Sequence, residues 1–128
     1  MMEQAVQVLA AVSFLVIGLS HLLRPRDWVA FFQDLAARGA PGAFFEGFLV
    51  LSFGAIIVSF HNVWEGPALV LTLIGWAQVI KGAIRFLAPE VALKIMARLS
   101  PERAWQFQAA GVFSLAVSGF LFWVRYSA

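Results

Sequence analysis

Residues 61–89 read HNVWEGPALVLTLIGWAQVIKGAIRFLAP and contain a short polar turn followed by an apolar run of membrane-spanning length. A helix needs about 20 mostly apolar residues to cross a hydrocarbon core of about 30 Å. The segment from about residue 67 to residue 87 meets that requirement, with Lys81 and Arg85 near its end. This stretch therefore predicts a transmembrane helix that follows directly on a tight turn.

Three further apolar runs have the same length, at about residues 4–23, 43–60 and 104–124. The composition agrees, because 62% of the 128 residues are hydrophobic and 12% are charged, against about 45–50% and 25% in soluble domains. A soluble domain of this size cannot bury so much apolar surface. We therefore expect a single all-α integral membrane domain, residues 1–128, with four transmembrane helices in a bundle.

The composition also excludes several classes of protein. The chain contains no cysteine, which rules out a disulfide-stapled secreted module and a cysteine-based zinc or iron–sulfur protein. Its apolar content is too high for a disordered chain. The remaining classes are those of membrane proteins.

Two connections between the spans are amphipathic and too charged to cross the membrane. They are RPRDWVAFFQDLAARGAPG at residues 24–42 and PEVALKIMARLSPER at residues 89–103. In each, apolar residues recur at helical spacing between charged ones, a pattern typical of helices that lie in the headgroup plane. We expect two short interfacial helices.

The distribution of Lys and Arg predicts the orientation, because short loops rich in these residues stay in the cytoplasm. Most of the nine cations flank the two amphipathic connections, and Arg125 alone lies near the other side. We expect a protein of the bacterial inner membrane with both termini and the turn at residues 61–67 outside. The positive charge then reflects topology and contact with anionic lipids, and we predict no nucleic-acid partner.

A shift of the sequence by 64 residues, half of the chain, aligns each element with a copy of itself. At this offset Gly18 matches Gly82, and other pairs match in the same way; they are Leu23 and Leu87, Pro25 and Pro89, Leu35 and Leu99, Gly47 and Gly111, and Leu51 and Leu115. This pattern indicates an internal repeat, residues 1–64 and 65–128, in parallel orientation. We expect two tandem helical hairpins.

Small residues mark the helix faces that are expected to pack together, since they let backbones approach closely in a membrane. Seven of them share faces within the last three spans: Gly47, Gly54, Gly75, Gly82, Gly111, Ser114 and Ser118. Most of the large apolar side chains are left for lipid.

A polar cluster is expected near the cytoplasmic ends of the spans. Lys81 lies about two turns inside the third span, where a cation is costly unless it is paired or reaches the interface. The other candidate members of this pocket are His21, Glu46, Arg85, Glu102 and Gln106. Two interpretations stay open. The first is a pocket that binds an anionic headgroup, a quinone or a small anion, or relays a proton through Glu46 and His21. The second is a set of snorkelling cations with a Lys81–Glu46 pair that only sets helix register.

The outer turn carries a second group of candidates, His61, Asn62, Trp64 and Glu65. These residues could bind a metal or meet a partner protein, or they could serve the turn itself while Trp64 anchors at the interface. His21 and His61 lie at opposite ends of the membrane, so they cannot share one metal within a chain.

The HNxW turn, the Thr72-x-x-Gly75-Trp76 step and Lys81-Gly82 before Pro89 resemble a group of small four-span bacterial inner-membrane proteins without an assigned function. A more distant likeness, in size and number of spans, is to DoxX-like four-helix membrane proteins, some of which accompany quinone-linked oxidoreductases. The first resemblance implies a location and a fold and supplies no catalytic residue.

No nucleotide-binding, metalloprotease or serine-hydrolase motif occurs in the sequence. We therefore expect a non-catalytic accessory or scaffolding subunit that associates with a larger membrane complex or with its own copies, and with membrane lipids. The alternative is a lipid-, quinone- or small-anion-binding carrier or redox-accessory subunit that uses the Glu46, Lys81, Arg85 and His21 cluster. No cofactor is predicted, although a bound lipid or quinone fits the alternative.

Overall fold

The structure, a computed structural model, describes residues 2–127, and in that range it consists of helices and short loops without a strand. The elements are, in chain order, α1 (Met2–Leu23), α2 (Pro25–Ala37), α3 (Ala40–Phe60), α4 (Leu69–Leu87), α5 (Pro89–Ala97), the 3-10 turn η1 (Pro101–Arg103) and α6 (Trp105–Tyr126). Four of them, α1, α3, α4 and η1 with α6, are long and apolar enough to cross a membrane. The prediction of an all-helical chain with four candidate spans is confirmed.

Two prolines separate the long helices from the short ones. Pro25 and Pro89 each stand at the first position of a short helix, where the missing N–H costs nothing. The residues before them, Arg24 and Ala88, leave the helical region of backbone space, as the proline ring requires. The chain therefore turns sharply after α1 and after α4.

The third span begins slightly later than the sequence predicts. Pro67 and Ala68 belong to a turn rather than to the helix, and α4 starts at Leu69. Gly66 has a φ of 74°, a left-handed conformation that glycine adopts at no steric cost. This turn lets the chain re-enter the bundle after α3.

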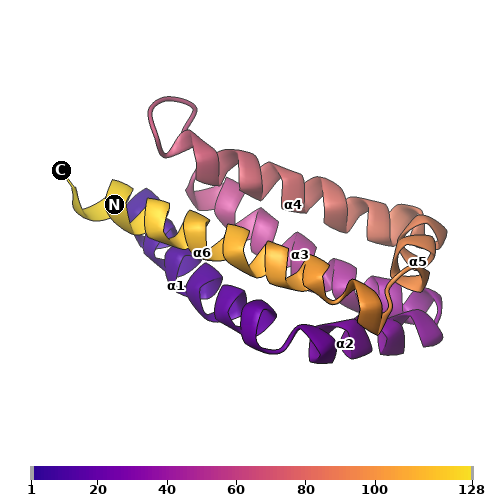
Figure 1. Cartoon of the computed structure of the whole chain (residues 1–128). Helices are drawn as coiled ribbons and strands as arrows, with labels where there is room; N and C mark the ends of the chain where they lie inside the picture. Colours follow the sequence, from indigo (N-terminus) through magenta and orange to yellow (C-terminus); the bar gives the residue numbers. More distant parts are fainter. Residues whose placement is uncertain (1, 128) are drawn as a thin grey trace.

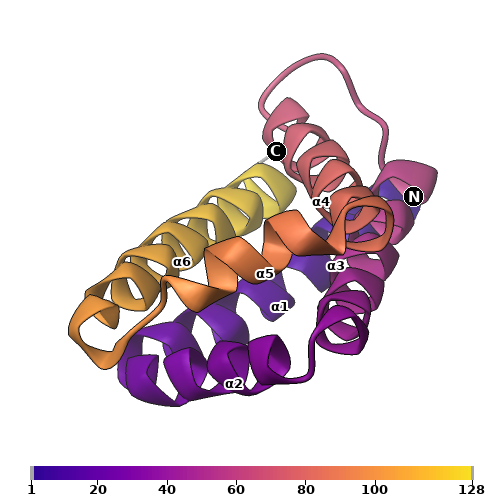
Figure 2. The ribbon, with the colours of Figure 1, turned by 90° about the vertical axis from the view of Figure 1, so that its right-hand side faces the viewer.

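The ends of the molecule differ in character (Figure 1). Both chain ends and the loop between α3 and α4 lie at one end, whereas α2 and α5 lie at the other. Seen from that second end, α2 and α5 run side by side across the ends of the four long helices (Figure 2). The two amphipathic segments thus share one end of the bundle.

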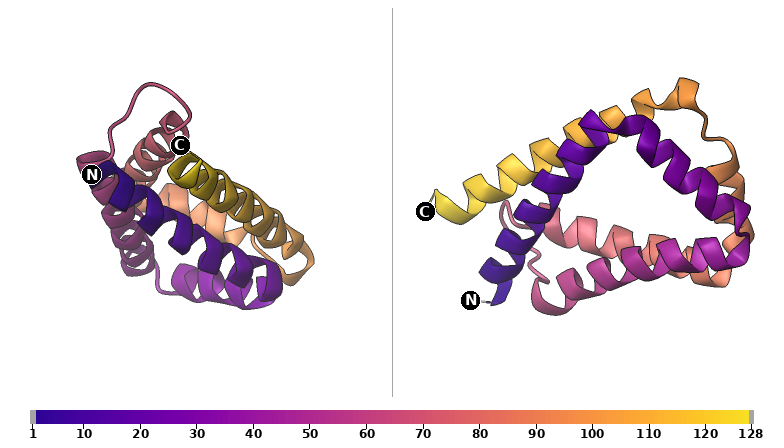
Figure 3. Two further views of the ribbon diagram at one scale, coloured as in Figure 1. Left: turned by 90° about the vertical axis from the view of Figure 1, so that its left-hand side faces the viewer. Right: turned by 90° about the horizontal axis from the view of Figure 1, so that it is seen from below.

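The long helices pack in two pairs, α1 with α6 and α3 with α4. The two tandem hairpins expected from the sequence, α1 with α3 and α4 with α6, are not confirmed, because α1 makes few contacts with α3 and α4 makes fewer still with α6. The two pairs diverge toward the end that carries α2 and α5 (Figure 3). The contact between α1 and α6 therefore joins the first helix of the chain to the last.

Glycines lie at the closest approaches within both pairs. A Cβ at Gly18 would lie 3.0 Å from the carbonyl oxygen of Gly111 and 3.2 Å from Leu115 Cγ. In the other pair, a Cβ at Gly82 would lie 2.6 Å from Leu51 Cβ. Both contacts are tighter than ordinary van der Waals contact, so the helix backbones approach each other at these positions because no side chain intervenes.

The other small residues singled out in the sequence also lie between helices. A Cβ at Gly54 would lie 2.7 Å from Val79 N, and one at Gly75 would lie 2.5 Å from Ile57 Cγ2. Ser118 donates a hydrogen bond of 2.6 Å to the carbonyl oxygen of Ala11. Ser114 contributes its Cβ to the contact with α1. These contacts hold α3 on α4 and α6 on α1.

Three apolar clusters join the two pairs. The largest draws on all four long helices near the end that carries the termini, with Ile57, Leu71 and Leu121 fully buried. At the opposite end the apolar sides of α2 and α5 turn inward and pack on α3, α6 and each other. The buried residues of these two clusters are Leu35, Ala43, Ala92 and Met96, and Val29, Ala104 and Phe107. The short helices therefore bridge the diverging pairs.

Candidate functional site

A buried carboxylate with two basic partners lies between α3 and α4. Arg85 Nε donates to Glu46 Oε2 over 2.5 Å, and Lys81 Nζ lies 3.5 Å from Glu46 Oε1. Lys81 and Arg85 are four residues apart, so they share one face of α4. The structure thus brings together three of the six residues expected in the polar pocket.

The glycine next to Glu46 makes this arrangement possible. A Cβ at Gly47 would lie 2.6 Å from Arg85 Cβ, so only glycine lets the Arg85 stem cross α3 at this point. The side chains of Glu46 and Arg85 are 5% and 9% exposed, whereas that of Lys81 is 44% exposed. One carboxylate therefore neutralises a buried guanidinium, and a second cation reaches outward.

The pairing has a clear energetic reason. A charge inside a low-dielectric region is costly alone and is tolerated when it is paired and hydrogen-bonded. Removal of one partner of such a pair typically costs about 3–5 kcal/mol, because it leaves the other charge buried without compensation. Glu46 therefore ties α3 to α4 and also holds Lys81 at the edge of the bundle.

The other three expected members lie elsewhere. Glu102 and Gln106 are exposed at the start of the last span. His21 belongs to an aromatic stack: its ring lies 4.2 Å from that of Trp28 and 5.7 Å from that of Phe107, and its Nδ1 donates 2.8 Å to the carbonyl oxygen of Ile17. The expected six-residue pocket is therefore not assembled, because α1 and α6 pack on each other and diverge from α3 and α4 toward the end of the bundle that carries α2 and α5.

The aromatic stack extends along α2. Trp28 also stacks on Phe31, Phe31 on Phe32, and Phe32 on Phe107. Together with His21 these rings tie α2 to α1 and α6. The apolar spacing of α2 in the sequence indicates that these residues share a side, but not which helices they meet.

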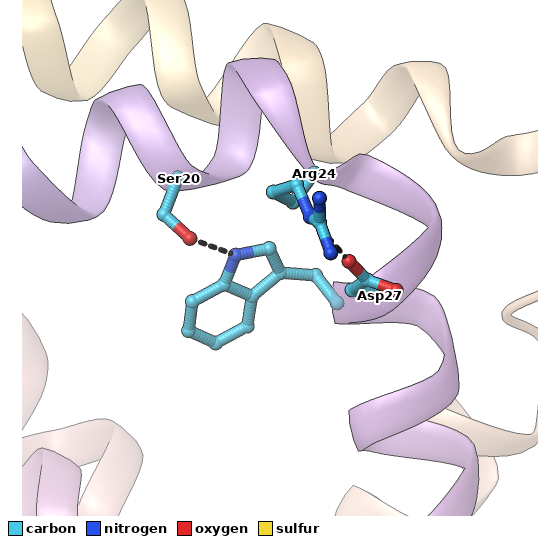
Figure 4. Close-up of polar contacts among 4 residues, drawn as sticks. Ser20, Arg24 and Asp27 are labelled. Carbon is cyan, nitrogen blue, oxygen red and sulfur yellow. Dashed lines mark hydrogen bonds and ion pairs between the residues drawn. The ribbon is translucent and has the colours of Figure 1, made fainter.

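Trp28 also makes a polar contact that the sequence reasoning missed. Its indole nitrogen donates 2.9 Å to Ser20 Oγ, and close by Arg24 Nε lies 2.6 Å from Asp27 Oδ2 (Figure 4). The Arg24 and Asp27 side chains are largely exposed. The Ser20–Trp28 bond fixes the angle between α1 and α2, because it spans the break at Pro25.

The candidate residues of the turn between α3 and α4 divide into buried and exposed ones. His61 is fully buried. Trp76 Nε1 donates 3.2 Å to Asn62 Oδ1, which ties the turn to α4. Trp64 and Glu65 are exposed. His61 and Asn62 thus serve the internal structure of this end.

His61 joins three helices through both of its ring nitrogens. Gln7 Nε2 lies 3.0 Å from His61 Nε2, and Thr72 Oγ1 lies 3.2 Å from His61 Nδ1. An amide nitrogen only donates, so Nε2 accepts from Gln7 and Nδ1 carries the proton that bonds to Thr72. Thr72 Oγ1 also accepts from the backbone N–H of Val63 over 3.0 Å. This arrangement requires a neutral imidazole.

Burial lowers the pKa of His61 below its ordinary value, and a hydrogen bond to the backbone and the charge of Glu3 oppose that effect in part. The desolvation and the hydrogen bond that Nε2 accepts from Gln7 thus favour the uncharged ring. Since both ring nitrogens are engaged, neither is free to bind a metal in this conformation. Residues 2–127 contain no group of three or more His, Asp or Glu side chains placed to hold a metal ion.

Comparison with known protein families, characterised proteins and solved structures finds no match to this chain. Three features of the structure bear on function. The first is the Glu46 cluster, which consists of Glu46, Lys81 and Arg85. The second is the His61 junction, formed by His61, Gln7 and Thr72, and the third is the set of outward faces of the long helices.

Proposed function

We propose that this chain is a non-catalytic scaffolding or accessory subunit of the bacterial inner membrane, which associates laterally with a larger complex or with its own copies. The observation that carries the proposal is the contrast between the inside and the outside of the bundle. The polar residues that are buried in the bundle are hydrogen-bonded or ion-paired within it, and large apolar side chains point outward from all four long helices.

The internal pairing accounts for the polar residues that are buried in the bundle. Glu46 is held by Arg85 and Lys81, and Ser118 bonds to a carbonyl of α1. Gln7 and Thr72 bond to His61. Each of these bonds joins two helices, which favours a structural role for these polar residues.

The outward faces are suited to lipid or to another transmembrane protein. Exposed large side chains occur on each long helix, for example Val16 on α1, Phe48 on α3, Ile80 on α4 and Phe113 on α6. Within a bilayer, helices associate by packing and not by the exclusion of water. A partner would therefore recognise the shape of one such face.

Site-specific photo-crosslinking in native membranes tests this proposal. A photoreactive residue at Phe48 or Phe113 is expected to give a protein adduct at native expression level from at least one face. The same residue at Leu121, which is fully buried, is the matched control and should give no adduct to another chain. A strictly monomeric protein in mild detergent, with only lipid adducts from both faces, would overturn the proposal.

A second function, binding of an anionic headgroup, quinone or small anion, is favoured by the exposed part of Lys81. Glu46 faces two cations, so the cluster carries a net positive charge, and the Lys81 ammonium has an exposed side on which an anion can sit. Glu46 and Arg85 would then position Lys81 for the ligand. His21 takes no part, because it lies in the aromatic stack.

Native mass spectrometry of the protein in the presence of phosphatidylglycerol separates this function from a purely structural cluster. Lys81→Met should lower occupancy of the anionic lipid, whereas Lys94→Met, which removes an exposed cation of α5, should leave it unchanged. Equal occupancy in both variants refutes ligand binding at Lys81 and leaves the scaffolding proposal intact.

We infer that α2 and α5 lie at the cytoplasmic interface, with both chain ends outside. The clustering of Lys and Arg at that end of the molecule supports this orientation. A cysteine placed at Trp64 should be labelled from outside intact cells, and one at Asp34 should not. The reverse pattern of labelling would invert the topology.

We also infer that residues 1–64 and 65–128 arose by duplication and exchange their packing partners. Gly18 packs on Leu115 in one pair, and the positions 64 residues away, Gly82 and Leu51, pack together in the other. Likewise Gly111 lies against His21, and the corresponding Gly47 lies against Arg85. These matched contacts support a two-fold relation in which the first span of each half packs on the second span of the other.

A further inference from the structure

A cavity of about 450 Å³ lies at the elbow where α2 is followed by α3, within the size range of small-molecule sites. Its principal lining residues are Phe31, Asp34, Leu35, Arg38, Pro41 and Phe45. The four that come from α2 and its C-cap stand at positions i, i+3, i+4 and i+7, so they share one side of that helix. The cavity is therefore a product of the angle between the two helices.

The walls and the rim differ in chemistry. Phe31, Leu35, Pro41 and Phe45 present apolar atoms, while the polar side chains come from one pair of opposite charge. Arg38 Nη2 lies 3.3 Å from Asp34 Oδ2, and these side chains are 66% and 64% exposed. An exposed pair of this kind holds its partners together only weakly. Both charges are thus available to a ligand.

The charges select a ligand with one anionic and one cationic group close together. A guanidinium binds a phosphate through two parallel hydrogen bonds, and a carboxylate accepts hydrogen bonds from a primary ammonium. Zwitterionic phospholipids with an ammonium headgroup carry both groups. An anionic lipid would satisfy Arg38 and place its negative charge beside Asp34.

An apolar track leads out of the cavity along α3. Phe45, Leu49 and Ile56 are exposed, and their spacing places them on one side of the helix. The first of them is part of the cavity wall. A chain that starts at the cavity can therefore continue along α3 toward the middle of the bundle.

We propose that this cavity binds a zwitterionic phospholipid, with Arg38 on the phosphate, Asp34 on the ammonium group and an acyl chain along α3. The site shares no residue with the Glu46 cluster and does not depend on lateral association. Its failure and that of the proposed function are therefore separate outcomes.

Native mass spectrometry of the full chain from nanodiscs with equal amounts of phosphatidylethanolamine and phosphatidylglycerol tests the site. The wild-type protein should retain phosphatidylethanolamine in preference. Asp34→Asn should lower that preference about two- to fivefold, the ratio that corresponds to an exposed charge pair. Arg38→Gln should lower the retention of both lipids.

Arg98→Gln is the matched control, because Arg98 ends α5 as Arg38 ends α2 and is likewise exposed. It should retain both lipids as the wild type does, and far-UV circular dichroism checks the fold of each variant. Preferential retention of phosphatidylglycerol by the wild type would overturn the proposal. Equal effects of Arg38→Gln and Arg98→Gln would show annular lipid only and would overturn it as well.

Discussion

Replacement of Gly54 by alanine places a methyl group between α3 and α4 where the helices leave no room for it. The new Cβ would lie 2.7 Å from Val79 N and 2.8 Å from Gly75 O. Both are backbone atoms, which cannot turn aside as a flexible side chain can. The helices must therefore move apart for the variant to fold.

The structure offers a matched comparison for the size of this effect. Ordinary contact begins at 3.4 Å, so α3 and α4 must separate by about 0.7 Å, which forfeits roughly a quarter to a half of the dispersion energy of the affected contacts. Overpacking typically costs about 1–3 kcal/mol. Gly119 on α6 has no atom within 4 Å of an added Cβ, so Gly119→Ala has the same gain in helix propensity without this cost.

The assay is the free energy of unfolding in mixed micelles, measured by titration with a denaturing detergent and followed by circular dichroism. Gly54→Ala should be less stable than Gly119→Ala by about 1–3 kcal/mol, or tenfold in the unfolding equilibrium for each 1.4 kcal/mol. Equal stability of the two variants would refute the close approach of α3 and α4 and with it the reasoning about the other glycines.

Three further predictions use other contacts. Glu46→Gln should lower the free energy of unfolding by about 3–5 kcal/mol, because it leaves Arg85 buried and uncompensated. Asp27→Asn in the exposed pair with Arg24 should lower it by at most about 1 kcal/mol, and equal losses in the same assay would contradict the burial of the Glu46 pair. The pKa of His61 is lowered in the folded state, so its contribution to stability should be fully present above about pH 6.5, the ordinary pKa of histidine, and should fall as the pH drops below that value. His61→Gln should flatten this dependence of stability on pH, and an unchanged profile in that variant would exclude the contacts of His61 as its origin. The chain has no cysteine, so the double variant Ala11→Cys, Ser118→Cys should form a disulfide that links α1 to α6 within one chain. The outward pair Leu9→Cys, Phe113→Cys should form none, and the opposite result would rule out this helix pairing.

The sequence predicts the candidate site in part. The i, i+4 spacing of Lys81 and Arg85 and the matching depth of Glu46 are visible in the sequence, because each is a rare charge in an apolar run. The partners of His61 are not visible, since Gln7 and Thr72 lie 54 and 11 residues away and belong to other helices. A polar residue in a span shows that it needs a partner but does not name it.

Local chemistry explains why the sequence by itself determined the helices of this protein. Apolar runs of membrane length, the prolines at positions 25 and 89 and the turn at Gly66 act on neighbouring residues, so they need no knowledge of the rest of the chain. Only the tertiary structure decided that α1 pairs with α6 and α3 with α4. The physical reason is that a face of small residues permits close approach by any complementary helix. The partner is selected by the shapes of the two specific faces, such as those that bring Gly18 against Gly111.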